Sequence, residues 1–239
     1  MIETNRLGLF LGQPLTTDTD VNIYSPTINH IALNGYEDYL IKLTLCSFNK
    51  ETILSGLFGS DEETLNDISN ENDFDILTAN PNLVSHICDA LSFFVQETVH
   101  FDSIYQAFMV DGKILATKNN YQYITEIIKE LNCVSDNEDK LKASSKKAQE
   151  MLKRMQMFEQ KQKKQDDGLE IKDVLSVLCS ANGNGINIFN VGQLTIYQVY
   201  EQFERLTTKD SFDRLLPVWA NGHLTGEAKL PEWIKKTKL

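Results

Sequence analysis

The clearest hydrophobic pattern of the chain lies near its C-terminus and predicts a well-defined helix. Its apolar positions recur at helical spacing on one face: Ile196, Val199, Tyr200, Phe203 and Leu206. Asn190 is expected to cap this helix, with Gln193 reaching back as in a capping box. Phe189 and Leu194 have the spacing of a hydrophobic staple across the same start. So sharply specified a start indicates a rigid element that docks against another part of a protein.

Start and stop signals divide the first half of the chain into further helices. Ser25-Pro26 predicts a helix with the serine as cap and the proline at its first position, and Gly35 is expected to end it. A second helix is expected from about residue 37 to 48. Its expected buried residues are Tyr39, Leu40, Leu43 and Cys46. Asn80-Pro81 repeats the start signal and opens a helix with a wide apolar stripe, and a further helix follows Asn119.

Strand signals are few in this half. Residues 1–24 are expected to form an irregular arm, with a short strand at 21–24. Between residues 108 and 116, Asp111-Gly112 supplies the two positive-φ positions of a tight turn and predicts a β-hairpin. Residues 50–80 are expected to hold short helical pieces between acidic, Asn-rich loops. The first part is therefore predicted to be mostly helical with one small sheet.

The second half begins with a long polar stretch, residues 139–166, which is poor in helix breakers and predicts one helix. Its narrow apolar stripe consists of Ala148, Met151, Leu152, Met155 and Phe158. Residues 167–170 break this helix and cap the next one. The expected buried face of that next helix is Ile171, Val174, Leu175 and Leu178. Further on, Thr207 with Asp210 has capping-box spacing and predicts another helix, which Pro217 kinks or ends.

Together these patterns predict a mainly α protein in three parts. Residues 1–138 form an acidic helical domain with a β-hairpin, residues 139–166 a basic linker helix, and residues 167–239 a small helical C-terminal module. The net charge of −11 supports this division, because residues 1–139 carry six basic and 22 acidic side chains, whereas residues 140–164 carry nine basic and two acidic ones. A cationic segment of this kind is typical of a charged connector.

The composition of the 239 residues favours a folded protein of the cytoplasm. No run approaches the roughly 18 apolar residues of a membrane helix, and the N-terminal residues lack the basic and apolar regions of a signal peptide. The four cysteines are far apart and form no C-x-x-C, which suits buried thiols in a reducing compartment.

No pattern in the sequence points to catalysis, to a metal or to a cofactor. The four histidines and four cysteines do not reach the spacing of a zinc site. Asp18, Asp20 and Asn22 match the first ligand positions of an EF-hand loop, but Ile23 stands where glycine is required and Asn29 where the bidentate glutamate belongs. Gly183-x-Gly185 lacks the continuation of a phosphate-binding loop. A non-enzymatic, protein-binding role is therefore expected.

The basic stretch has three interpretations. A solvated or intramolecular connector is favoured, a helix that binds a partner protein comes second, and a nucleic-acid contact comes third. The third would use these cations on phosphates: Lys146, Lys147, Lys153, Arg154, Lys161, Lys163 and Lys164. The flanking acidic domain would repel the same phosphates, and the Met and Phe stripe favours a protein contact.

The aromatic residues of the second half have two interpretations, as core or as partner surface. Core is the commoner role, but a segment of about 70 residues buries only a modest core of its own. The candidate partner-binding residues are Ile196, Tyr197, Tyr200, Phe203, Trp219, Trp233, Met151, Met155 and Phe158.

Several stretches resemble a protein family of tailed bacteriophages that infect Gram-positive bacteria. The sharpest likeness lies in residues 173–177 and 187–203, followed by an aromatic residue near a short basic tail at 233–236. Looser likenesses lie in the first half, at residues 25–31, 35–39, 89–94 and 127–133. The resemblance covers most of the chain and includes no catalytic signature.

The resemblance implies a tail assembly chaperone, a host-cytoplasmic factor that holds the tape measure protein during tail building. Its implied partners are phage tail proteins, namely the tape measure protein and the tail tube protein, and a homo-oligomer is compatible with the family. Such proteins are often made in a short form and a frameshifted longer form, and Lys146-Lys147 or Lys163-Lys164 could be encoded by slippery A-rich runs. A virion structural component of tail, neck or baseplate is the alternative, and a nucleic-acid-binding phage protein the third choice.

Overall fold

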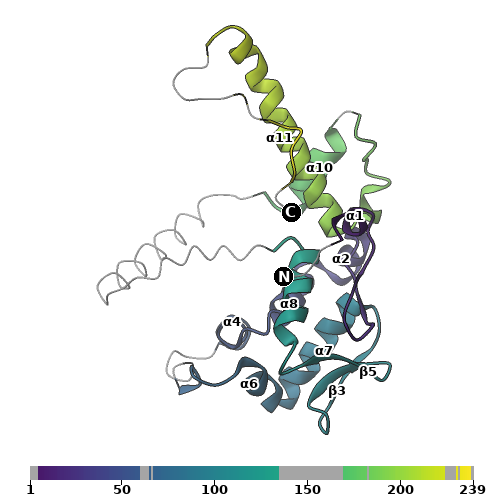
Figure 1. The fold of residues 1–239 in the computed structure, drawn as a ribbon, viewed down its shortest axis with the longest axis vertical. Helices are drawn as coiled ribbons and strands as arrows, with labels where there is room; N and C mark the ends of the chain where they lie inside the picture. Colours follow the sequence, from purple (N-terminus) through teal and green to yellow (C-terminus); the bar gives the residue numbers. More distant parts are fainter. Residues whose placement is uncertain are drawn as a thin grey trace, which may run out of the picture. The chain divides into compact units, whose positions relative to one another are not determined.

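The computed structural model describes residues 5–59, 65, 67–134, 169–181, 183–223, 230 and 232–237. The described residues are mainly α-helical, as predicted, and they form two small sheets where one was expected (Figure 1). It divides into two compact units, one formed by residues 1–134 and 188–239 and the other by residues 135–187. The predicted linker helix at 139–166 lies outside the described residues.

The first unit contains most of the described helices. In its N-terminal part these are α1 (Arg6–Phe10), α2 (Ile28–Asn34), α3 (Tyr36–Leu45), α4 (Lys50–Phe58), α6 (Asp73–Ala79), α7 (Pro81–Val95) and α8 (Tyr121–Leu131). The C-terminal part of the unit contains a 3₁₀ turn, η1 (Val191–Gln193), and the long helix α11 (Ile196–Ala220).

Helix α7 is the centre of this unit, and it begins as predicted. The Asn80 side chain accepts hydrogen bonds from the first free N–H groups, and Pro81 occupies the first helical position. One face of α7 packs against α3, and its end contacts the neighbouring sheet. The residues of α7 that are buried are Leu83, Ile87, Cys88, Ala90, Leu91, Phe93, Phe94 and Val95. This continuous apolar face makes α7 the core helix.

The predicted hairpin is confirmed, but it belongs to a larger sheet. β4 (Ala107–Val110) and β5 (Lys113–Thr117) pair antiparallel across Asp111 and Gly112, whose φ angles of 45° and 76° are those the turn requires. A third strand that the sequence did not signal, β3 (Val99–Asp102), pairs with β4 on the other side. The second sheet joins β1 (Leu15–Thr16) and β2 (Asn22–Ile23).

Several local predictions in the N-terminal part were wrong. The helix expected at Ser25-Pro26 begins two residues later, because Thr27 is its cap and accepts a hydrogen bond from the His30 N–H. The arm expected to be irregular contains α1, capped by Asn5. Leu40 is exposed rather than buried, because α3 turns that side toward solvent. Gly35 ends α2 as predicted.

The described part of the second unit contains α10 (Ile171–Ser180). Glu170 caps this helix and forms a capping box with Asp173, which confirms the predicted start. Val174 and Leu178 are buried, and Leu175 and Ile171 are half-buried. The apolar face predicted from the sequence is therefore the less exposed face of α10.

Candidate functional site

The docked end of α11, residues 194–199, is joined to the start of α2 by main-chain hydrogen bonds. The Ile28 N–H donates to the Leu194 carbonyl over 2.9 Å, and the Ile196 N–H donates to the Pro26 carbonyl over 2.9 Å. Thr27 and Thr195 thereby face each other in an antiparallel bridge. Two segments about 170 residues apart in the chain thus share a short strand-like seam.

Side chains reinforce this seam on both sides. The Tyr197 N–H donates to the Ser25 hydroxyl over 3.2 Å, and the Gln198 side-chain amide donates to the Phe10 carbonyl over 2.9 Å. A Cβ atom at Gly192 would overlap the Asn29 side chain, so a larger residue there would require Asn29 to move. The docked end is therefore held by α1 and by α2.

The start of α11 differs from the one predicted. Thr195 is the cap, and Gln198, three residues on, completes the capping box, so the box lies five residues after the expected pair. Asn190 instead precedes η1, and the Phe189 side chain is 92% exposed, which leaves no staple. The reason is that Leu194 must be extended to pair with α2, and an extended residue cannot continue a helix from Asn190.

The docked end is also the most buried part of α11. Ile196, Tyr197 and Val199 are 1%, 3% and 0% exposed. Nearby, the Tyr39 hydroxyl donates to the Asn132 side chain over 3.0 Å. Burial raises the pKa of the Tyr200 hydroxyl, and it raises the pKa of the Cys133 thiol to about 12. Both groups therefore remain protonated at neutral pH.

The outer part of α11, residues 204–220, has the opposite character, because none of its residues is buried. Leu216, Val218 and Trp219 are 38%, 36% and 55% exposed. Its charges are paired along the helix itself, as Lys209 with Asp213 and Arg214 with Asp210 at i, i+4 spacing. We call this part the outer arm.

The helix predicted to start at Thr207 does not exist as a separate element. The Thr207 hydroxyl donates back to the carbonyls of Phe203 and Glu204, as a threonine inside a helix does. α11 runs on past Pro217, which lies in its last turn, and ends at Ala220. The spacing of Thr207 and Asp210 was thus misleading, because the helix was already established.

A short C-terminal segment, residues 232–237, returns along α11, and we call it the strap. Arg205 donates to the main-chain carbonyls of Trp233 and Lys235 over 3.0 and 2.8 Å. At the other end, Arg6 on α1 donates to the hydroxyl of Thr237 over 2.7 Å and to its carbonyl over 3.3 Å. The strap therefore contacts both α11 and the helix on which α11 docks.

The structure places the predicted partner-binding residues in several environments. Ile196 and Tyr197 are buried at the seam, and Trp219 is exposed on the outer arm. The half-buried members are Tyr200, Phe203 and Trp233. Met151, Met155 and Phe158 lie outside the described residues. A partner-binding role for the nine residues stays a prediction.

The residues that hold the seam and the strap were not recognised in the sequence. Ser25 and Pro26 were interpreted as a helix start, and Arg205 carried no signal at all. Each acts on a residue far away in the chain or on a main-chain atom, so spacing alone does not reveal the role. The stretch that resembles the phage family, residues 187–203, does include the docked end of α11.

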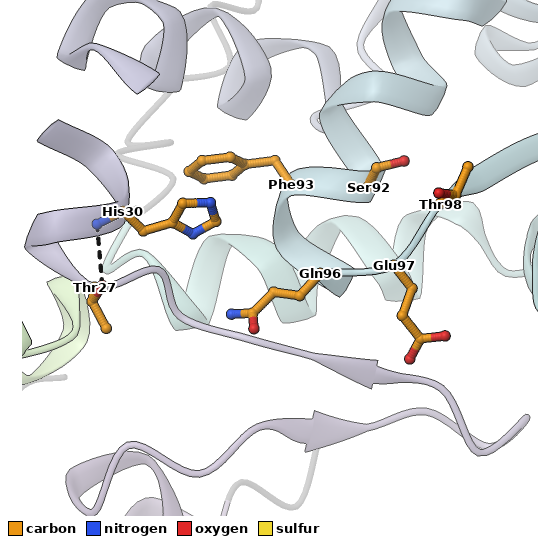
Figure 2. Close-up of a pocket in the computed structure, with 7 residues that line it drawn as sticks. All are labelled: Thr27, His30, Ser92, Phe93, Gln96, Glu97 and Thr98. Atoms are coloured by element: carbon orange, nitrogen blue, oxygen red, sulfur yellow. Dashed lines mark hydrogen bonds between the residues drawn. The ribbon is translucent and has the colours of Figure 1, made fainter. Parts of the chain in front are cut away.

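A pocket of about 650 Å³ opens beside the seam (Figure 2). Its lining residues are Thr27, His30, Ser92, Phe93, Gln96, Glu97 and Thr98. The His30 ring stacks on Phe93 with ring centres 4.4 Å apart, and burial, with the nearby Lys42 ammonium, lowers the pKa of His30. His30 is therefore neutral at pH 7.

The polar groups of this pocket do not form a nucleophile and base. The Ser92 hydroxyl donates to the Cys88 carbonyl over 2.7 Å and accepts from the Val99 N–H over 2.8 Å. It thus fixes the end of α7 to β3 and is not bonded to His30. Gln96, Glu97 and Thr98 follow the end of α7 and complete the lining (Figure 2). The arrangement suits hydrogen bonding to a bound group rather than acyl transfer.

Within the described residues, no three of the His, Cys, Asp and Glu side chains gather as a metal site would require. The helices of the described part include none that is both long and apolar enough to cross a membrane.

Comparison with known proteins finds similarity to phage sequences. The model of a family described as YomV second domain matches residues 159–238. The chain is also similar to the SPbeta prophage-derived uncharacterized protein YomV of Bacillus subtilis (strain 168), with 23% identity over 199 residues, which is 82% of this chain and 75% of the relative. No solved structure matches. The similarity indicates a phage-derived protein.

Proposed function

We propose that this protein is a non-enzymatic phage tail morphogenesis factor, a tail assembly chaperone that binds the tape measure protein. The observation that carries the proposal is the contrast within α11. One end is fixed in the core of its unit, whereas the outer arm presents apolar side chains that are partly exposed, Trp219 at 55%. The similarity to a prophage protein and the resemblance noted in the sequence supply the phage context.

The mechanism follows from helix pairing. Residues 204–220 span about 25 Å at 1.5 Å per residue, enough to contact several turns of another helix. Leu216, Val218 and Trp219 would pack against apolar positions of the tape measure protein, as amphipathic helices do in hydrophobic grooves. The rigid docked end would keep the arm from collapsing onto the chain's own core. Covered in this way, the tape measure protein would stay unaggregated until tail tube protein assembles around it.

A co-purification experiment tests the arm. The protein is expressed with the tape measure protein of its own phage, and the complex is captured through the tape measure protein. The double variant Leu216→Ala and Trp219→Ala should lower the captured amount at least tenfold. The matched control is Ile104→Ala with Tyr105→Ala, two large side chains in the turn between β3 and β4 that are more exposed than Leu216 and Trp219. The proposal is wrong if both double variants lower the captured amount equally, or if neither of them lowers it.

The alternative, a structural component of tail, neck or baseplate, makes a different prediction about the particle. Mass spectrometry of purified virions should detect a structural component in every particle, whereas a chaperone should be absent. Detection at a stoichiometric level would replace the chaperone proposal with the structural one.

A further inference from the structure

The strap contacts α11 mainly through its backbone. Arg205 donates from one nitrogen, Nη1, to the carbonyls of residues 233 and 235, which a bend in the chain at residues 233–235 brings within reach of the same nitrogen. Carbonyl oxygens are common to all residues, so this recognition depends little on sequence. The side chains of Glu232, Ile234, Lys235 and Lys236 are exposed and contribute no specificity.

Two side chains of the strap do contact the rest of the unit. Lys209 lies over the Trp233 ring, with its Nζ 5.7 Å from the ring centre, which is within the range of a cation–π contact. Thr237 is 8% exposed, and its hydroxyl accepts from Arg6. The strap is thus anchored by one aromatic residue and, four residues later, by one small hydroxyl residue.

The spacing shows that the strap lies antiparallel to α11. Thr237 is bound beside the docked end through Arg6, which also contacts Tyr197, while residues 233 and 235 are bound at Arg205. The strap therefore runs back along α11 from Arg205 toward the docked end and α1.

We propose that the surface of α1 and α11 under the strap is a peptide-binding site that the strap itself occupies, and that a segment of a partner protein displaces the strap. The segment that fits carries an aromatic residue, exposed backbone carbonyls and a small hydroxyl residue four positions after the aromatic. Displacement is favoured by the strap's weak sequence dependence, because a partner needs only to reproduce those few contacts. This inference stands on the contacts of the strap and does not depend on the proposed function.

A released form of the full chain provides the test. It carries Trp233→Ala and Thr237→Ala, which remove the two side-chain anchors. The probe is a fluorescent peptide of residues 230–239, and its binding is followed by fluorescence anisotropy. The released chain should bind the peptide at least tenfold more tightly than the wild type, because the wild-type strap competes at the high effective concentration of a linked segment. No difference in affinity would overturn the proposal.

Two matched arginine variants test whether the peptide binds the surface of α11 around Arg205. Arg205→Gln in the released chain should weaken peptide binding at least tenfold, whereas Arg214→Gln should leave it unchanged, because Arg214 pairs with Asp210 on the same helix and no contact with the described strap residues 232–237 is found. Equal effects of the two changes, with circular dichroism showing both chains folded, would contradict the assignment. A peptide with alanine in place of its tryptophan should also bind weakly.

A second measurement needs no change to the strap. In a full chain with Trp219→Phe, Trp233 is the one remaining tryptophan. Adding millimolar peptide that has phenylalanine instead of tryptophan should displace the strap and shift the Trp233 emission to longer wavelength. An emission that stays constant at every peptide concentration would show that the strap is not displaced.

Discussion

The two ends of α11 show how differently one continuous helix can be used. At the docked end, Ile196 and Val199 are buried and their backbone neighbours pair with α2. In the outer arm, Leu216 and Trp219 are exposed although they are as apolar as the buried pair. Apolar character alone therefore does not decide burial in this helix, and the antiparallel pairing of residues 194–196 does. The difference separates a structural role from a binding role along the same element.

Removing a buried side chain from the docked end should have the largest effect. Ile196→Ala should lower the free energy of unfolding by about 3 kcal/mol, through lost burial and the cavity left behind. Leu216→Ala, a similar change in the outer arm, should cost about 0.5 kcal/mol or less. Urea unfolding followed by circular dichroism measures both. Similar losses in the two variants would remove the distinction between the two ends.

The next comparison is between two threonines of α11, the cap Thr195 and the interior residue Thr207. Thr195→Ala should destabilise by about 1 kcal/mol, because the cap of α11 loses its side-chain acceptor. Thr207→Ala should be neutral or slightly stabilising, since alanine is the better residue inside a helix. Thermal unfolding of the two variants distinguishes them. If Thr207→Ala loses more stability than Thr195→Ala, Thr207 acts as a helix cap, as its spacing from Asp210 predicted.

The smallest expected effect concerns pH. The pKa of Tyr200 is raised in the folded chain by burial and by the nearby Tyr36 and Cys133. The contribution of Tyr200 to the free energy of unfolding is therefore fully present below the ordinary tyrosine pKa of about 10. It is lost as pH rises from there through the raised pKa of the folded chain. Tyr200→Phe should flatten the decline in stability above pH ~10, as measured by urea unfolding at a series of pH values. If stability declines with pH equally in Tyr200→Phe and in the wild type, the group that titrates is not Tyr200.

Local signals in the sequence predicted the elements whose cause is local. The Asn80-Pro81 start of α7 and the Asp111-Gly112 turn of the hairpin were both correct, because a cap or a turn is decided by neighbouring residues. The mainly α class followed from the same patterns. The apolar face of α10 was also recovered, since its helix is capped within its own sequence.

Features caused by distant partners were not predictable in the same way. The cap of α11 is Thr195 rather than the predicted Asn190, because Leu194 pairs with Ile28. No pattern among the neighbouring residues predicts that pairing. β3 has only four residues and was missed, since its reason to be a strand is its neighbour β4. For the candidate site, the sequence named Trp219 and Trp233 but not Arg205, whose partners are main-chain carbonyls.

The seam has a consequence for folding during synthesis. The Ser25 hydroxyl and the Tyr197 N–H are 172 positions apart, so the seam is a contact of very high sequence separation. At 5–20 residues per second, a ribosome would finish α2 roughly 10–30 s before it makes the partner segment. During that interval the Ile28 N–H and the Pro26 carbonyl have only water as partners, and long-range contacts of this kind form late and slowly. Any product that stopped before residue 194 would keep this edge open permanently, and its surface would differ from that of the full chain at α2.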